Sequence, residues 1–169
     1  TLTLNGGGTL LCKANTTDDN LFYITEDASL VINGITLDGN RMNYFELVGI
    51  RVQDGTCTMN SGTIQNFKNI RYGAAIYVNR TYKPEEGIDE LGTFYFNGGT
   101  ITGNVTYDSS QKQGGAGIYN MGVVEMKGGT ITGNTAVLGG GIYANSSAGE
   151  VKISGNPTVT DNTVDGKQN

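Results

Sequence analysis

The stretch GGTITGN occupies residues 98–104 and occurs again at residues 128–134. Degenerate copies of it run along the whole chain of 169 residues, with a period of about thirty residues. A repeat of this length that is rich in glycine, asparagine and threonine is typical of a solenoid, in which successive turns of the chain stack on one another. The repeat therefore predicts a stacked architecture without a single globular core.

Six segments of the repeat alternate apolar and polar residues, as strands with one buried face do. Their inward positions are Leu4, Ile32, Met59, Phe96, Met126 and Ile153, at spacings of 28, 27, 37, 30 and 27. A glycine-containing corner follows each segment, since glycine supplies the backbone conformations that a sharp corner needs. A second short strand follows the corner, centred on Leu10, Leu37, Ile64, Ile101, Ile131 and Val159.

A third strand is predicted in each coil at residues 74–77, 116–119 and 140–143, with equivalents at 21–24 in the first coil and 44–47 in the second. Three short strands with corners between them predict an all-β fold, a right-handed parallel β-helix of about six coils. No stretch has helical periodicity. We expect residues 1–169 to form a single β-helix domain.

Most copies end in a turn that contains an asparagine: Asn40, Asn66, Asn104, Asn134 or Asn162. Asparagine side chains at equivalent positions can hydrogen-bond from one coil to the next. The sequence therefore predicts an asparagine ladder along the axis.

The segments TITGNTA at residues 130–136 and GGGIY at residues 139–143 resemble the repeats of bacterial cell-surface proteins of the adhesin-like β-helix type. The glycine-rich element is also similar to that of the chlamydial polymorphic outer membrane proteins, and pectate-lyase-like enzymes share this type of coil. The resemblance implies a secreted, extracellular location at the cell surface and an adhesive role. It also implies that the chain is a fragment of a longer repeat-containing surface protein.

The formal charge of −5 and the absence of a basic cluster argue against nucleic acid or an anionic membrane as a partner. No apolar run approaches the roughly 18 residues of a membrane span, so we expect no membrane insertion. The chain has no histidine, which removes the commonest general base and transition-metal ligand. Cys12 and Cys57 are either reduced core residues or a disulfide that would indicate an oxidising compartment.

Two insertions interrupt the repeat, at residues 79–92 and 105–114. Insertions in solenoids protrude from one face, which is often the binding face, although a solvated polar loop is the simpler interpretation. The first insertion carries the chain's densest group of carboxylates: Glu85, Glu86, Asp89 and Glu90. Crowded oxygen ligands of this kind form a candidate calcium site, and no other cofactor is expected.

If the isoleucines of the third strands point inward, then Tyr77, Tyr119 and Tyr143 point outward in a row, about 4.8 Å apart. Tyrosine offers a sugar ring both an apolar face and a hydroxyl group, so the row is a candidate glycan-binding surface that Tyr82 and Tyr107 could flank. The alternative is that stacked tyrosines stabilise one another. A regular Thr-x-Thr array also resembles ice-binding solenoids, although only three coils keep both threonines.

The sequence thus favours a non-catalytic adhesin or stalk segment, with a glycan, a surface protein or neighbouring repeats of its parent chain as partners. The alternative is a polysaccharide-active lyase or glycoside hydrolase of the β-helix type, or an inactive relative. A glycosidase of this kind needs two carboxylates facing each other across a groove. No adjacent coils place two carboxylates at matching outward positions.

Overall fold

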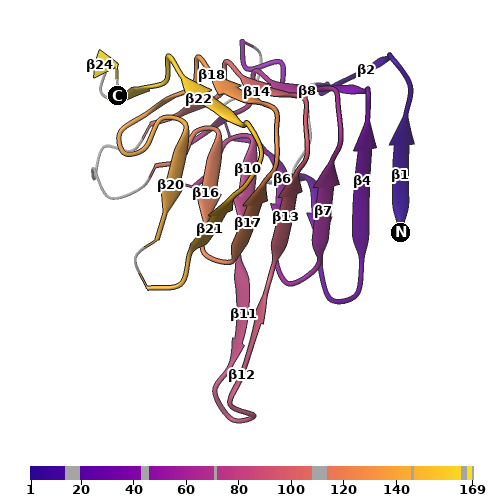
Figure 1. Ribbon diagram of the computed structural model, residues 1–169, viewed down its shortest axis with the longest axis vertical. Coiled ribbons are helices and arrows are strands. Elements are labelled where there is room, and N and C mark those ends of the chain that lie inside the picture. The colour runs from indigo at the N-terminus through magenta and orange to yellow at the C-terminus, as the bar shows by residue number, and fades with distance from the viewer. Residues whose placement is uncertain are drawn as a thin grey trace.

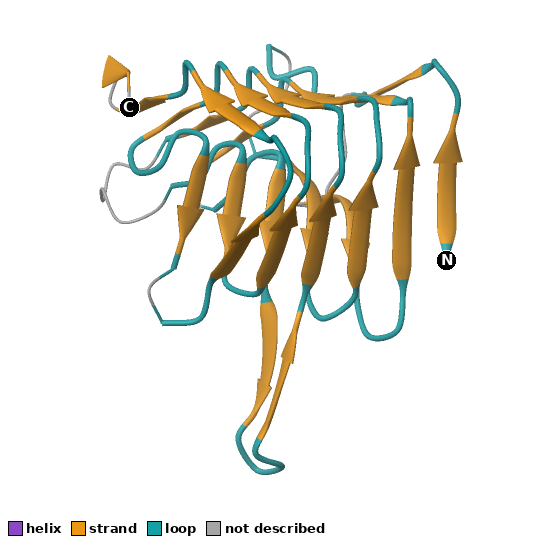
Figure 2. Cartoon of the chain, in the orientation of Figure 1, coloured by secondary structure: helices purple, strands orange, loops and turns teal. Residues whose placement is uncertain are grey.

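The computed structural model describes residues 1–13, 20–42, 46–70, 72–107, 114–145, 147–164 and 167–168. In this part of the chain there are strands and loops and no helix (Figure 2). The strands stack in parallel into a β-solenoid of about five turns (Figure 1). The predicted all-β parallel β-helix is therefore confirmed.

Two sheets contain six parallel strands each, one from every aligned copy of the repeat. The first sheet consists of β1 (Leu2–Asn5), β4 (Ser29–Asn33), β7 (Thr56–Met59), β13 (Thr93–Phe96), β17 (Val123–Met126) and β21 (Glu150–Ile153). The second sheet consists of β2 (Thr9–Leu11), β5 (Thr36–Asp38), β8 (Thr63–Gln65), β14 (Thr100–Thr102), β18 (Thr130–Thr132) and β22 (Thr158–Thr160). The pairing has the register that the sequence predicts, with Ile32 opposite Met59 and Ile101 opposite Ile131.

The third sheet consists of β3 (Asn20–Ile24), β6 (Val48–Val52), β10 (Ile76–Val78), β16 (Ile118–Asn120) and β20 (Ile142–Ala144). The prediction of a strand at residues 44–47 is wrong, because the strand of the second coil is β6, which pairs with both β3 and β10. Residues 44 and 45 lie outside the described residues, and Leu47 forms only an isolated bridge with Lys68.

A fourth, short sheet lies between the second and third sheets along the chain. It consists of β9 (Lys68–Asn69), β15 (Val105–Thr106), β19 (Thr135–Ala136), β23 (Thr163–Val164) and β24 (Lys167–Gln168). The prediction of three strands per coil is therefore wrong for the coils that contribute to this sheet. Strands of two residues are too short to show an alternating pattern, so no periodicity marks them in the sequence.

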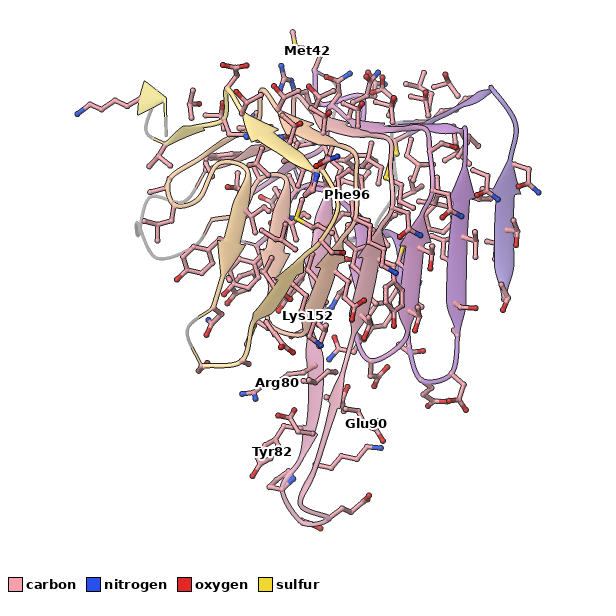
Figure 3. All side chains as sticks on the ribbon, viewed as in Figure 1. Met42, Arg80, Tyr82, Glu90, Phe96 and Lys152 are labelled. Carbon is pink, nitrogen blue, oxygen red and sulfur yellow. The ribbon has the colours of Figure 1, made fainter. Side chains whose placement is uncertain are left out.

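The core fills the inside of the solenoid with columns of side chains from successive coils. The inward residues of the middle coils, such as Met59, Ile64 and Ile76, are fully buried and belong to one hydrophobic cluster. Phe94 and Phe96 add two buried rings that stack at 5.9 Å (Figure 3 labels Phe96 within the body of the solenoid). Each coil therefore buries its apolar face mainly against its neighbours, as in other solenoids.

Glycine is required at the corners between the first and second sheets. Gly129 has a φ of 81°, which side chains other than glycine rarely adopt. A Cβ atom at Gly129 would also lie 2.4 Å from the Phe96 ring of the coil below. The corner thus needs both the backbone freedom and the small size of glycine.

An internal asparagine ladder satisfies the buried turns of the last three coils. The Asn104 side-chain amide donates to Asn134 Oδ1 at 2.9 Å, and the Asn134 amide donates to Asn162 Oδ1 at 2.9 Å. The predicted asparagine-to-asparagine ladder is confirmed for these three residues, whereas Asn40 and Asn66 also bond to the preceding coil but to other groups. Asn40 and Asn66 have positive φ angles, and their amides donate to the Cys12 carbonyl and to the Asp38 carboxylate instead.

A second, exposed ladder runs along the ends of the first-sheet strands and was not predicted. It connects Asn5, Asn33, Asn60 and Asn97 through side-chain hydrogen bonds of 2.8, 2.9 and 2.9 Å. The signal was present in the sequence, because an asparagine directly follows the inward residue of each of the first four strands.

The insertion at residues 79–92 forms an antiparallel hairpin of β11 (Arg80–Lys83) and β12 (Ile88–Leu91). The hairpin projects from the stacked strands as a thin arm (Figure 1), as predicted for an insertion. Cys12 and Cys57 are both buried free thiols. The reduced alternative therefore holds, and burial raises the pKa of both thiols.

Candidate functional site

The outward side of the third sheet carries a column of side chains that includes the predicted tyrosine row. Tyr77 is paired with Tyr119 and Tyr119 with Tyr143, so the predicted register is confirmed. Toward the N-terminal coils the column continues with Arg51, which is paired with Tyr77. Tyr23, which is paired with Arg51, ends the column. An arginine thus occupies the position that the other four coils give to tyrosine.

The local sequence explains why these side chains share one face. A small residue and then an isoleucine precede the column residue in four of the strands, as in Gly117-Ile118-Tyr119 and Gly49-Ile50-Arg51. The isoleucine points into the core and is fully buried in β6, β10 and β16, so the next residue must point outward. A Cβ atom at Gly117 would lie 2.4 Å from the Gly141 carbonyl oxygen, which shows how closely the neighbouring coils approach there.

Tyr72, from the loop between β9 and β10, covers the middle of the column. Its ring stacks on Tyr77 at 5.3 Å and meets Tyr119 edge-on at 5.0 Å. Tyr119 in turn stacks on Tyr143 at 5.3 Å, and the Tyr77 hydroxyl donates to Met121 Sδ at 3.8 Å. We call Tyr72, Tyr77, Tyr119, Met121 and Tyr143 the aromatic cluster.

Burial within the aromatic cluster limits what the predicted row can contact. Tyr77 is only 8% exposed and Tyr119 only 4%. Their rings point out of the solenoid as predicted, yet neighbouring side chains cover them. The open strip of three stacked tyrosines is therefore absent, and this part of the row stabilises the fold.

The phenol of Tyr77 lies in an apolar environment, and desolvation raises its pKa to about 12, with the nearby Arg51 cation opposing part of the shift. Desolvation also raises the pKa of Tyr119, whose hydroxyl accepts a hydrogen bond from Asn145. An ordinary tyrosine is already neutral at physiological pH, and the raised pKa values of both phenols extend this neutral range to higher pH.

Arg51 is held between two tyrosine rings and a glutamine. Its guanidinium carbon lies 5.2 Å from the centre of the Tyr23 ring and 5.1 Å from that of Tyr77. Its Nε and Nη2 atoms both donate to Gln53 Oε1, at 3.0 and 2.7 Å. Gln53 is itself fixed by the hydrogen bond from its amide to the Arg80 carbonyl at 2.8 Å. These contacts fix the plane of the guanidinium group.

A hollow of about 400 Å³ opens beside Arg51 and the end of the aromatic cluster. Its described lining consists of Asn20, Glu46, Val48, Arg51, Asn69, Ile70, Tyr72 and Tyr77. The volume is in the range of small-molecule sites, which are usually concave and combine apolar walls with a few polar groups. Here the side chains supply aromatic and aliphatic walls, a cation, a carboxylate and two amides. We call this hollow the Arg51 hollow.

Of the predicted tyrosines, the structure places only Tyr77 in the Arg51 hollow. Tyr82 lies on the projecting hairpin and is 61% exposed (Figure 3). Tyr107 follows β15, and the Lys68 ammonium group lies 4.6 Å from the centre of its ring. Residues 108–113, which make up most of the second insertion, lie outside the described residues.

The four predicted calcium ligands do not come together. Asp89 pairs with Arg80 at 2.9 Å, and Glu90 pairs with Lys83 at 3.1 Å (Figure 3 labels Arg80 and Glu90 on the hairpin). Asp89 and Glu90 are adjacent in β12 and therefore face opposite sides of the hairpin. Across the described residues, no group of three or more acidic or cysteine side chains is arranged to hold a metal ion.

The sequence does not predict that Arg51, Glu46, Tyr72 and the two amides share one site. The signal for Arg51 was the triplet Gly49-Ile50-Arg51, which matches the Gly-Ile-Tyr triplets of later coils once the second-coil strand is placed at β6. Tyr72 had no such signal, because the equivalent positions of later coils, four residues before Ile118 and Ile142, hold Gly114 and Leu138.

Among the described residues, no helix has the length and hydrophobicity of a membrane span. Comparisons of the chain with protein-family models, with curated proteins and with solved structures find no match.

Proposed function

We propose that this protein is an extracellular, non-catalytic segment of a bacterial surface adhesin that contacts glycans through the Arg51 hollow. The observation that carries the proposal is the hollow itself, which combines an aromatic wall, two amides, one cation and one carboxylate on the side of a solenoid. Aromatic faces with nearby hydrogen-bonding groups suit the apolar and hydroxyl faces of a sugar. The resemblance of the repeat to adhesin-like surface proteins supports the same function.

The solenoid supplies the second part of this function, a stiff support. Hydrogen-bonded ladders and parallel sheets connect each coil with the next. A surface protein built in this way holds its binding site at a fixed distance from the cell. The projecting hairpin β11–β12 is a further exposed element of the same scaffold, and neighbouring repeats of a longer parent chain would continue it.

The composition of the hollow favours binding over hydrolysis. Glycoside hydrolases use two carboxyl groups about 5 to 9.5 Å apart. Among the described lining residues, Glu46 is the one carboxylate. Glu46 alone can accept hydrogen bonds from sugar hydroxyls, but it lacks the second acid that the reaction requires.

A broad glycan array, probed with the purified protein with and without calcium, tests this proposal. We expect selective retention of one glycan class, loss of that signal in Tyr72→Ala and a reduced signal in Glu46→Gln. Tyr82→Ala is the matched control, because Tyr82 is exposed on the hairpin and outside the hollow. Circular dichroism checks that Tyr72→Ala remains folded.

A blank array at high protein concentration would contradict glycan contact and leave a stalk as the better function. Retention that depends on calcium and on the hairpin carboxylates would move the site to β11–β12.

A further inference from the structure

The guanidinium group of Arg51 has one edge engaged and one edge free. Arginine carries five N–H donors, and Gln53 Oε1 accepts from the edge formed by Nε and Nη2. The remaining edge, formed by Nη1 and Nη2, has no hydrogen-bond partner among the described residues. This edge presents two parallel N–H groups, the arrangement that binds an oxyanion in bidentate fashion.

Arg51 also lacks an acidic partner in the described part of the chain. The ion pairs there involve Arg80, Lys83 and Lys152, and none involves Arg51. Its positive charge lies against tyrosine rings in a half-buried position, where water compensates it less than at an open surface. A bound anion would therefore gain more from Arg51 than from an exposed lysine.

The other polar residues of the hollow show what else the ligand must carry. Glu46 is exposed at the hollow and would repel a bare inorganic anion. Its carboxylate can instead accept hydrogen bonds from hydroxyl groups. A ligand with an oxyanion at one end and hydroxyls at the other satisfies both residues, and Tyr72 offers its ring an apolar contact.

We propose that the Arg51 hollow is selective for an anionic sugar, whose carboxylate or sulfate group binds the free edge of Arg51 while its hydroxyls contact Glu46. This inference rests on the proposed glycan binding and adds the charge of the ligand.

Matched pairs of probes test it, measured by isothermal titration calorimetry on the intact chain. One pair is a glucuronate-containing tetrasaccharide and its methyl ester, and a second is a sulfated disaccharide and its desulfated form. A third pair is sialyllactose and lactose. We expect at least one anionic probe to bind about tenfold or more tighter than its neutral partner, as charge-assisted hydrogen bonds predict. A difference within the glucuronate or sialyllactose pair shows that the hollow binds a carboxylate. A difference within the disaccharide pair shows that it binds a sulfate.

Arg51→Gln should abolish the preference, so that each anionic probe binds no more tightly than its neutral partner. Lys152→Gln removes the same charge from β21, at a half-exposed site outside the hollow. This control variant should bind every probe with the affinity of the parent protein. Thermal unfolding of both variants shows whether they are folded, and Arg51→Lys, which retains the charge without the fork, should recover only part of the affinity.

Equal binding within every pair would overturn the anionic preference while leaving glycan binding intact. Absence of binding to all six probes, together with a blank array, would overturn both proposals. An anionic preference that persists in Arg51→Gln would assign the anion to another site and contradict this inference.

Discussion

Tyr23 and Tyr77 lie on either side of Arg51 in the same column, yet Tyr23 is 56% exposed and Tyr77 only 8%. Tyr23 belongs to β3, the edge strand of the third sheet, whereas Tyr77 lies between Arg51 and Tyr119 and also stacks on Tyr72. A tyrosine at one position of the repeat is therefore buried or exposed according to its neighbours in the adjacent coils and loop. Equivalent positions in a solenoid share an orientation but differ in their chemistry.

The pKa of Tyr77 gives a prediction at this scale. Its pKa is raised from 10.0 to about 12 in the folded protein, so folding favours the protonated phenol. This contribution to stability is fully present below pH 10 and is lost as the pH rises through about 12. We expect Tyr77→Phe to be as stable as the parent protein at neutral pH and to lose less stability above pH 10.

Urea denaturation at a series of pH values, with tyrosinate absorbance followed in parallel, measures both effects. Tyr77→Phe should also lack the tyrosine ionisation near pH 12. An unchanged alkaline profile in this variant would show that Tyr77 ionises like an exposed tyrosine.

At the scale of the element, the corners of the solenoid depend on asparagines in two different environments. Asn134 is fully buried and bonds to both neighbouring coils, whereas Asn97 donates one exposed side-chain hydrogen bond to Asn60. An unpaired buried polar group costs far more than an exposed one, because water can replace the lost partner only at the surface. The internal ladder should therefore contribute most of the stability.

Asn134→Ala should lower the free energy of unfolding by about 3 kcal/mol or more, since each buried group that it leaves unpaired costs about 1–3 kcal/mol. Asn97→Ala is the matched control and should cost less than about 1 kcal/mol. Urea denaturation of the two variants makes the comparison. Similar losses in both would refute the distinction between the ladders.

The sequence predicted the elements whose pattern repeats, and it failed where the pattern was short or interrupted. Alternating residues and glycine corners identified the first two sheets, because burial on one face imposes a period of two. The second-coil strand was misplaced because Arg51 stands where later coils have tyrosine. The Arg51 hollow was not predictable as a unit, since Glu46 and Tyr72 stand at loop positions whose residue type does not recur from coil to coil.

At the scale of the whole molecule, the solenoid tolerates insertions because each coil contacts only its neighbours. Gly92 is aligned with Gly122 through the first sheet, and Asn79 is aligned with Met121 through the third. Met121 and Gly122 are adjacent in the chain, while residues 80–91 separate Asn79 from Gly92. The whole hairpin is therefore an addition to a complete coil.

Deletion of residues 80–91 should leave the fold intact. The Asn79 carbonyl already accepts a hydrogen bond from the Gly92 amide at 2.8 Å, so the two ends lie close together. The ion pairs lost with the hairpin are partly exposed and contribute little. We expect an unchanged circular dichroism spectrum and a thermal midpoint within about 4 °C of the parent, equivalent to about 1 kcal/mol. Loss of cooperative unfolding would show that the hairpin is part of the core structure.

The most direct measurement for the glycan site is an NMR titration of the isotopically labelled protein with the anionic probe that binds tightest. We predict that the Arg51 Nε–Hε signal shifts, together with the amide signals of Asn20, Glu46, Asn69 and Tyr72, while those of β11 and β12 do not. Shifts confined to the hairpin, or no shift at saturating probe, would contradict glycan binding in the Arg51 hollow.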